Sequence, residues 1–202
     1  MYLDKIVCLL LLMISINSFS QHSDAPGITN IIKASFLSPG VSYEKGIGKF
    51  QSVVGRVFLA SAFSFSSSSA LGTNSNISID PSLALQYRYY YNNAQREAKG
   101  RRTEKNSLNY VSLIAETGFS RNSLSSSYLT EEDRRPVYSI GVAWGLQRNY
   151  PKRFSVDLNI GGGYVFASNT KPDEFGEPVK VNSGKFTTIG NLSLGFWLNK
   201  KN

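Results

Sequence analysis

The segment RFSVDLNIGGGYVFAS, residues 153–168, decides the fold class of this 202-residue chain. Every second residue from Phe154 to Phe166 is large and apolar, with one glycine among them. The intervening residues, from Ser155 to Ala167, are small, polar or charged apart from Val165. This alternation predicts a β-strand, because successive side chains leave opposite faces of an extended chain. Strands of soluble domains usually end after about five or six residues, so the length of this one leaves open which face is the interior.

The same alternation recurs along most of the chain. It is clear in residues 77–92, 138–147 and 191–198, and weaker in residues 53–65 and 108–120. The pattern predicts six full-length strands, at residues 50–65, 77–92, 107–120, 136–149, 153–168 and 185–199. A helical period is missing apart from one short turn expected within residues 94–105.

The segment ahead of these strands, TNIIKASFLSPGVSYEK at residues 29–45, carries a break signal at Pro39-Gly40. Bacterial single-chain membrane barrels nearly always have an even number of strands. The segment is therefore divided into two short strands, 29–37 and 41–45, which gives eight in total. A single long bulged strand is the alternative.

The second face of the strands mixes small residues with isolated charges. Small and ionic groups suit the crowded interior of a narrow barrel, so the oily face is expected to point outward. The expected interior charges are Arg56, Asp80, Arg88, Glu116 and Asp157. We expect these charges to pair and plug the interior; a conducting or substrate-steering lumen is the alternative.

Aromatic residues gather near the strand ends, where a bilayer interface holds amphipathic rings. The expected interface aromatics are Tyr87, Tyr89, Tyr91, Phe154, Tyr164 and Phe196. The sequence therefore predicts an all-β fold, an eight-stranded antiparallel up-and-down transmembrane β-barrel. A secreted lipocalin-like barrel carrying a small apolar ligand, or a β-sandwich, is the rival interpretation.

The first 20 residues have the layout of a secretory signal peptide, with Lys5, an apolar run at 6–16, and small residues at Ser18 and Ser20. Cleavage is expected after Ser20, followed by a lead-in at 21–28 and the barrel domain at 29–202. A buried helix or a membrane anchor is the alternative for this segment. The one cysteine, Cys8, lies in the apolar run, so the mature chain is expected to have no thiol chemistry.

The formal charge of +8 is unevenly distributed. In an eight-stranded antiparallel barrel both termini lie at one end, together with the connections 45–50, 93–106 and 150–152. The side chains expected at this end, with Glu44 counted among them, carry the whole net charge, whereas the loops at the opposite end are nearly neutral. Because the termini of outer-membrane barrels face the periplasm, we assign the basic rim there, near anionic lipid or peptidoglycan. Its basic run lacks the interleaved aromatics of a nucleic-acid site.

The sequence contains few side chains that could catalyse a reaction. The only histidine, His22, lies outside every expected strand, so a proton-transferring base is missing. No catalytic residue, metal site or cofactor is predicted. The glycines at 161–163 and the Gly46-x-Gly48-Lys49 run do not match a phosphate loop. A lipid-modifying barrel enzyme that uses Asp80, Glu116 or Asp157 is the remaining enzymatic alternative.

Two stretches, SFLSPGVSYEKGIGKF (35–50) and YRYYYNNAQREAKGRRTEKNSLNYVSL (87–113), resemble the small outer-membrane β-barrel proteins of the Bacteroidota. The shared features are the pattern at 42–44, the tyrosine-rich strand end at 89–92, the basic stretch at 96–102 and the restart at 106–110. The resemblance spans about residues 29–120 by motif. It implies a Gram-negative outer-membrane location and recognition of Phe196 and Trp197 by the barrel-assembly machinery, and it implies no activity.

The expected protein is thus a monomeric, non-enzymatic barrel in contact with outer-membrane lipid. Its expected role is structural, surface interaction or a narrow, porin-like solute passage.

Overall fold

The computed structural model describes residues 27–68, 72–122, 130–172, 175 and 178–199. The predicted leader at 1–20, Cys8 and His22 lie outside this part of the chain. Side chains within 61–77, 122–132, 171–172 and 178 are not described, and for these strand segments only the backbone enters the description.

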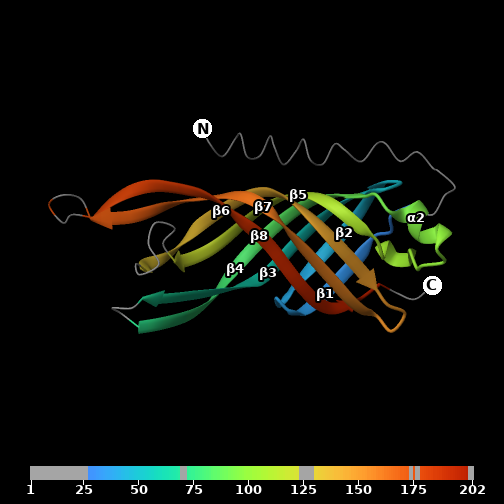
Figure 1. Ribbon diagram of the computed structural model, residues 1–202, viewed down its shortest axis with the longest axis horizontal. Coiled ribbons are helices and arrows are strands. Elements are labelled where there is room, and N and C mark those ends of the chain that lie inside the picture. Colours follow the sequence, from blue (N-terminus) through green and yellow to red (C-terminus); the bar gives the residue numbers. More distant parts are fainter. Residues whose placement is uncertain (1–26, 69–71, 123–129, 173–174, 176–177, 200–202) are drawn as a thin grey trace.

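The described residues form eight antiparallel strands in a closed up-and-down barrel, in which each strand pairs with its sequence neighbours and β1 pairs with β8 (Figure 1). This confirms the predicted all-β, eight-stranded barrel. The strands are β1 (Ile31–Leu37), β2 (Gly40–Gly48), β3 (Gln51–Ser68), β4 (Gly72–Tyr90), β5 (Asn109–Asn122), β6 (Thr130–Asn149), β7 (Phe154–Pro172) and β8 (Pro178–Trp197).

The segment interrupted by Pro39-Gly40 forms two strands, β1 and β2, and not one bulged strand. Their pairing runs from Ile31↔Glu44 to Ser35↔Gly40. Ser38 takes a positive φ of 52° in the turn between them. The break signal therefore marks a tight hairpin.

Several strands run past their predicted ends on the side away from the termini. β6 begins at residue 130 and not 136, β7 ends at 172 and not 168, and β8 begins at 178 and not 185. Most of the loops expected at 66–76, 121–135 and 169–184 are therefore strand, and those loop predictions were wrong. Alternation disappears in these polar segments, but ladder hydrogen bonds use the backbone and continue without it. Figure 1 shows the three long hairpins projecting beyond the β1–β2 hairpin.

The strands are steeply inclined to the barrel axis. Lys33 on β1 pairs directly with Trp197 on β8. Following the paired residues from Lys33 the other way round the barrel, through β2 to β7, leads to Lys185 on β8, which is 12 residues from Trp197. An offset of roughly 40 Å along the strands, set against roughly 38 Å for eight strand spacings, gives a tilt of roughly 45°.

The distribution of polarity is inverted relative to a soluble domain. Asp157 is 7% exposed and Arg88 3%, whereas Ile160 is 55% and Leu83 49% exposed. The polar face of each strand is therefore the interior, as predicted. The buried apolar cluster is small and consists of Tyr90, Leu108 and Tyr110, with Ile28 packed against it.

The long connection 91–108 folds over the terminus end of the barrel. It holds α2 (Asn93–Ala98) and the 3-10 turn η2 (Glu104–Asn106), which confirms the helical turn predicted there. Neither element approaches the length and hydrophobicity of a membrane-spanning helix, and no other described segment is such a helix. Asn106 exchanges hydrogen bonds of 2.8 Å with the backbone of Thr29, and Asn149 donates to the carbonyl of Lys105 at 2.6 Å. Leu108, the last residue of this connection, packs against Tyr90 and Tyr110, and we call the connection the cap.

Candidate functional site: the barrel interior

A continuous network of polar side chains fills the half of the barrel nearest the termini. We call it the polar plug. Every member is 7% exposed or less, and the set draws on seven of the eight strands, β1 to β7. Its members are Lys33, Glu44, Ser52, Gln86, Arg88, Tyr90, Tyr110, Gln147 and Asp157.

Asp157 on β7 is one centre of the plug. Its Oδ2 atom lies 2.9 Å from Lys33 Nζ and 2.9 Å from Arg88 Nη1. Its Oδ1 atom accepts a 2.7 Å hydrogen bond from the Tyr110 hydroxyl. The Arg88 guanidinium also lies 4.2 Å above the Tyr110 ring and donates twice to Gln86. Both carboxylate oxygens are thus satisfied by charged or hydroxyl donors.

Gln147 on β6 joins this centre to a second one at Glu44. Its Oε1 atom accepts from Lys33 and Arg88, each at 2.7 Å. Its Nε2 atom donates to Glu44 at 2.9 Å. Glu44 also accepts from Ser52 at 2.8 Å and from the Tyr90 hydroxyl at 2.5 Å.

The plug is electrically balanced, with two cations, Lys33 and Arg88, and two anions, Glu44 and Asp157. Burying a charge is costly unless it is paired and hydrogen-bonded, and here each charge has at least two partners. The balanced network is therefore compatible with a dry, closed interior.

Only Arg88 and Asp157 of the plug were among the predicted interior charges. Glu44 was assigned to the basic rim, and that assignment was wrong, because the side chain is fully buried. Lys33 was missed because the short β1 has apolar residues on both faces, so its alternation gives no inward direction. Tyr90 and Gln147 lie on inward positions of clearly alternating strands and Tyr110 on an inward position of a weaker one, and strand parity was the signal that could have found them.

A cavity of about 360 Å³ lies beside the plug, toward the long hairpins. Arg56, Ala84, Glu116 and Ser139 follow one another along a single pairing row of β3 to β6, and all four line the cavity. Because Ala84 and Ser139 have small side chains, the space beside the longer side chains of Arg56 and Glu116 stays unfilled.

The three remaining predicted interior charges all line this cavity. Arg56 lies 4.0 Å from the Phe58 ring centroid and donates to the Ser38 carbonyl at 3.1 Å. Asp80 forms a 2.9 Å ion pair with Arg134, whose side chain is 44% exposed. Of the predicted interior charges, Arg88 and Asp157 are the two that pair with each other.

The predicted interface aromatics all lie on the outer face, and four of them belong to two groups of rings. At the terminus side, Tyr91 accepts a 2.7 Å hydrogen bond from Trp144, and Phe154 packs against Tyr150 and Phe196. At the far side lie Tyr138, Tyr164, Phe166 and Phe186, in successive ring contacts. The other predicted aromatics, Tyr87 and Tyr89, are 41% and 42% exposed on β4.

The two aromatic groups bound an uncharged band. Phe154 and Tyr164 are ten residues apart on β7, which at a 45° tilt is about 23 Å along the barrel axis. The outward positions between them are Val156, Leu158, Ile160 and Gly162. On β4 the outward positions between Ile79 and Tyr89 are likewise without charge.

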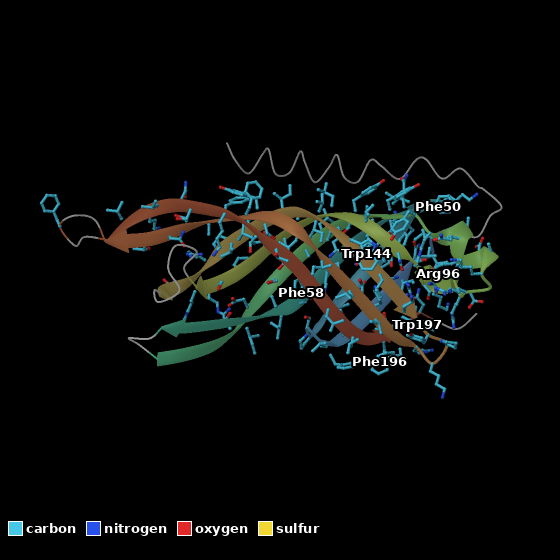
Figure 2. The ribbon with its side chains drawn as sticks, in the orientation of Figure 1. Phe50, Phe58, Arg96, Trp144, Phe196 and Trp197 are labelled. Carbon is cyan, nitrogen blue, oxygen red and sulfur yellow. The ribbon has the colours of Figure 1, made fainter. Side chains whose placement is uncertain are left out.

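The last strand divides its two adjacent aromatics between the two faces. Phe196 is 48% exposed, whereas Trp197 is 1% exposed and donates from Nε1 to the Tyr150 carbonyl at 2.9 Å. Figure 2 shows both residues at the capped end, as it does Arg96. Lys105 and Arg153 lie over the Trp197 ring, 4.5 Å and 5.6 Å from its centroid.

The capped end carries the basic rim. Partial burial, together with the charge of Arg101, lowers the pKa of Arg96 in α2. The described rim has ten basic and two acidic side chains: Lys45, Lys49, Arg96, Glu97, Lys99, Arg101, Arg102, Glu104, Lys105, Arg148, Lys152 and Arg153.

The described residues hold no group of three His, Cys, Asp or Glu side chains that could bind a metal ion. Comparison with protein-family models, with curated proteins and with solved structures finds no match to the chain. The function is therefore inferred from the geometry of the interior and from the outer surface.

Proposed function

We propose that the chain is a transmembrane barrel of a Gram-negative outer membrane, made with a cleaved leader, that serves as a closed structural or surface-interaction element. The observation that carries this proposal is the uncharged outer band of about 23 Å between two aromatic groups, around a polar interior. Outer-membrane barrels have an apolar band about 25 Å tall flanked by aromatic girdles. Exposing the same surface to water would leave a continuous apolar patch around the molecule, which soluble monomers rarely tolerate.

The basic rim supports an orientation. Both ends of the described part of the chain, Gly27 and Asn199, lie with the cap on the rim side, and in outer-membrane barrels the termini face the periplasm. In this orientation Lys and Arg side chains of the rim contact anionic headgroups of the inner leaflet, and the long hairpins extend outside the cell.

The polar plug favours a closed barrel over a solute passage. Eight strands leave room only for side chains or one small ligand, and the plug and the cap occupy the terminus half. Any route from the cavity to the periplasm would have to break the Asp157 and Glu44 networks.

Phase partition tests the membrane proposal. The protein is extracted from membranes with Triton X-114, warmed to separate the phases, and run on a gel with and without boiling. The proposal expects the protein in the detergent phase, with a boiling-dependent shift in mobility. Recovery in the aqueous phase without detergent would favour a secreted lipocalin-like carrier.

A further inference from the structure

The barrel wall has a side opening above its shortest hairpin. Pairing of β2 with β3 ends at Gly40↔Phe58, and pairing of β1 with β8 ends at Leu37↔Leu194. Beyond these pairs no described pairing joins β3 to β8, although both strands continue. Figure 1 shows β3 and β8 diverging on this side.

The interior cavity reaches this opening. Its lining includes Ala60 on β3 and Ile189 on β8, on either side of the opening. Phe58 and Asn191 also line it just below, where they contact Gly40 and Ser38 of the β1–β2 hairpin. Thr187, also on the lining, is exposed. The cavity therefore extends to the interrupted part of the wall, above the β1–β2 turn, whose Ser38 hydroxyl donates to Asn191 Oδ1 at 3.2 Å.

The opening lies within the height of the apolar band. On β8 the residue paired with the end of β1 is Leu194. Phe186, which belongs to the far aromatic group, lies eight residues before Leu194, toward the long hairpins. Outward residues next to the opening include Leu59 and Leu192, 41% and 43% exposed. In the proposed membrane placement, the opening faces the outer half of the bilayer.

Three charged residues line the cavity. Asp80 is paired with Arg134, whereas Arg56 and Glu116 face the same cavity without an ion pair between them. Arg56 and Glu116 share a pairing row with Ala84 between them, so their Cα atoms are roughly 10 Å apart. Among the described residues neither forms an ion pair. Arg56 is held by the Ser38 carbonyl and the Phe58 ring, close to the opening.

The geometry points to a binding site for the headgroup of a zwitterionic phospholipid, a ligand class that the proposed function does not assign. The phosphate contacts the Arg56 guanidinium, which favours oxyanions through two parallel hydrogen bonds. The ammonium group contacts Glu116, and the acyl chain leaves through the opening onto the apolar surface beside Leu59 and Leu192. This inference rests on the proposed membrane location.

Native mass spectrometry of the full-length protein released from micelles tests the site, with lysophosphatidylethanolamine as the probe. We expect one bound lysolipid per barrel. Arg56→Gln and Glu116→Gln should each weaken binding about tenfold or more, because each removes a charge-assisted contact. Ala84→Phe, which fills the cavity without altering a charge, should abolish binding. The matched controls Lys180→Gln, exposed near the start of β8, and Glu97→Gln, on the exposed rim, should bind as the unaltered protein does.

Two related probes define the headgroup. Lysophosphatidic acid, which lacks the ammonium group, and dodecylamine, which lacks the phosphate, should each bind about tenfold more weakly. Equal binding of lysophosphatidic acid, with no effect of Glu116→Gln, would overturn the zwitterion assignment. Equal binding of leucine, which has no acyl chain, would overturn the lipid assignment.

The outcome is separable from that of the membrane proposal. A protein that partitions into detergent and shifts on boiling, yet binds no lysolipid, contradicts this inference alone. A protein that partitions into water contradicts the proposed function. Variants are compared only after each shows the boiling-dependent gel shift, so a folding defect is not read as lost binding.

Discussion

Asp157 and Arg88 lie 69 residues apart in the chain and form a 2.9 Å ion pair inside the barrel. Lys33 and Tyr110 also donate hydrogen bonds to the Asp157 carboxylate. Gln147 links these residues to Glu44, to which it donates. A narrow barrel with these groups unpaired would hold isolated charges away from water, so we expect the loss of one partner to destabilise the folded barrel.

Asp157→Asn is predicted to destabilise the barrel by roughly 3–5 kcal/mol, because it leaves Lys33 and Arg88 buried with one net positive charge too many. Urea unfolding of the refolded protein in lipid vesicles measures the change. Glu97→Gln, on the exposed rim, should alter stability by no more than about 0.5 kcal/mol. Equal unfolding curves for the two variants would show that the pairing of Asp157 contributes nothing.

Two glycines on the adjacent strands β6 and β7 are predicted to respond in opposite ways to valine. A Cβ at Gly145 would overlap the ring of Tyr110 inside the barrel, whereas a Cβ at Gly162 meets nothing within 4 Å on the outside. Gly145→Val should cost roughly 1–3 kcal/mol through overpacking. Gly162→Val should be neutral or stabilising, since glycine weakens a strand. The same unfolding assay checks both, and a harmless Gly145→Val would contradict the inward packing of Tyr110.

Planar-bilayer recordings are predicted to show no discrete conductance steps, since the plug and the cap close the terminus half. Insertion is verified in parallel by the boiling-dependent gel shift of the same preparation. Reproducible single-channel steps from verified protein would replace the closed barrel with a pore.

The orientation predicts which end of the barrel reagents can reach on intact cells. Because Cys8 lies in the expected leader, single cysteines can be placed at either end without a background thiol. Lys180→Cys, at the end of the long hairpins, should react with a membrane-impermeant maleimide. Lys99→Cys, on the rim, should react only after the outer membrane is permeabilised. The reverse pattern would invert the proposed orientation.

Much of the fold could be predicted from the sequence because a strand alternates with a period of two residues. That period identified the six long strands and assigned Asp157 and Ile160 to opposite faces. It fails in the polar extensions such as 130–135, where the backbone ladder continues without an apolar face. It also fails in β1, which is short and has apolar residues on both faces, so Lys33 was missed.

Which interior residues contact one another was harder to predict than which face of each strand points inward. Which inward residues meet depends on the stagger of all eight strands, and an error of two residues in one register moves a partner out of reach. Arg56, Ala84 and Glu116 become neighbours only through two successive registers. The side opening arises because the β1–β2 hairpin is shorter than the other hairpins. The predicted lengths of those other hairpins were too short, so the opening was not predicted.

Quenching of tryptophan fluorescence by brominated lipid tests the central claim most directly. Trp144 is 40% exposed on the outer face and Trp197 is 1% exposed inside. In vesicles whose lipids carry bromine on the acyl chains, the Trp197→Phe protein, which retains Trp144, should be strongly quenched. The Trp144→Phe protein, which retains Trp197, should be quenched little. Weak quenching of Trp144, or equal quenching of both tryptophans, would contradict an outer face that contacts hydrocarbon.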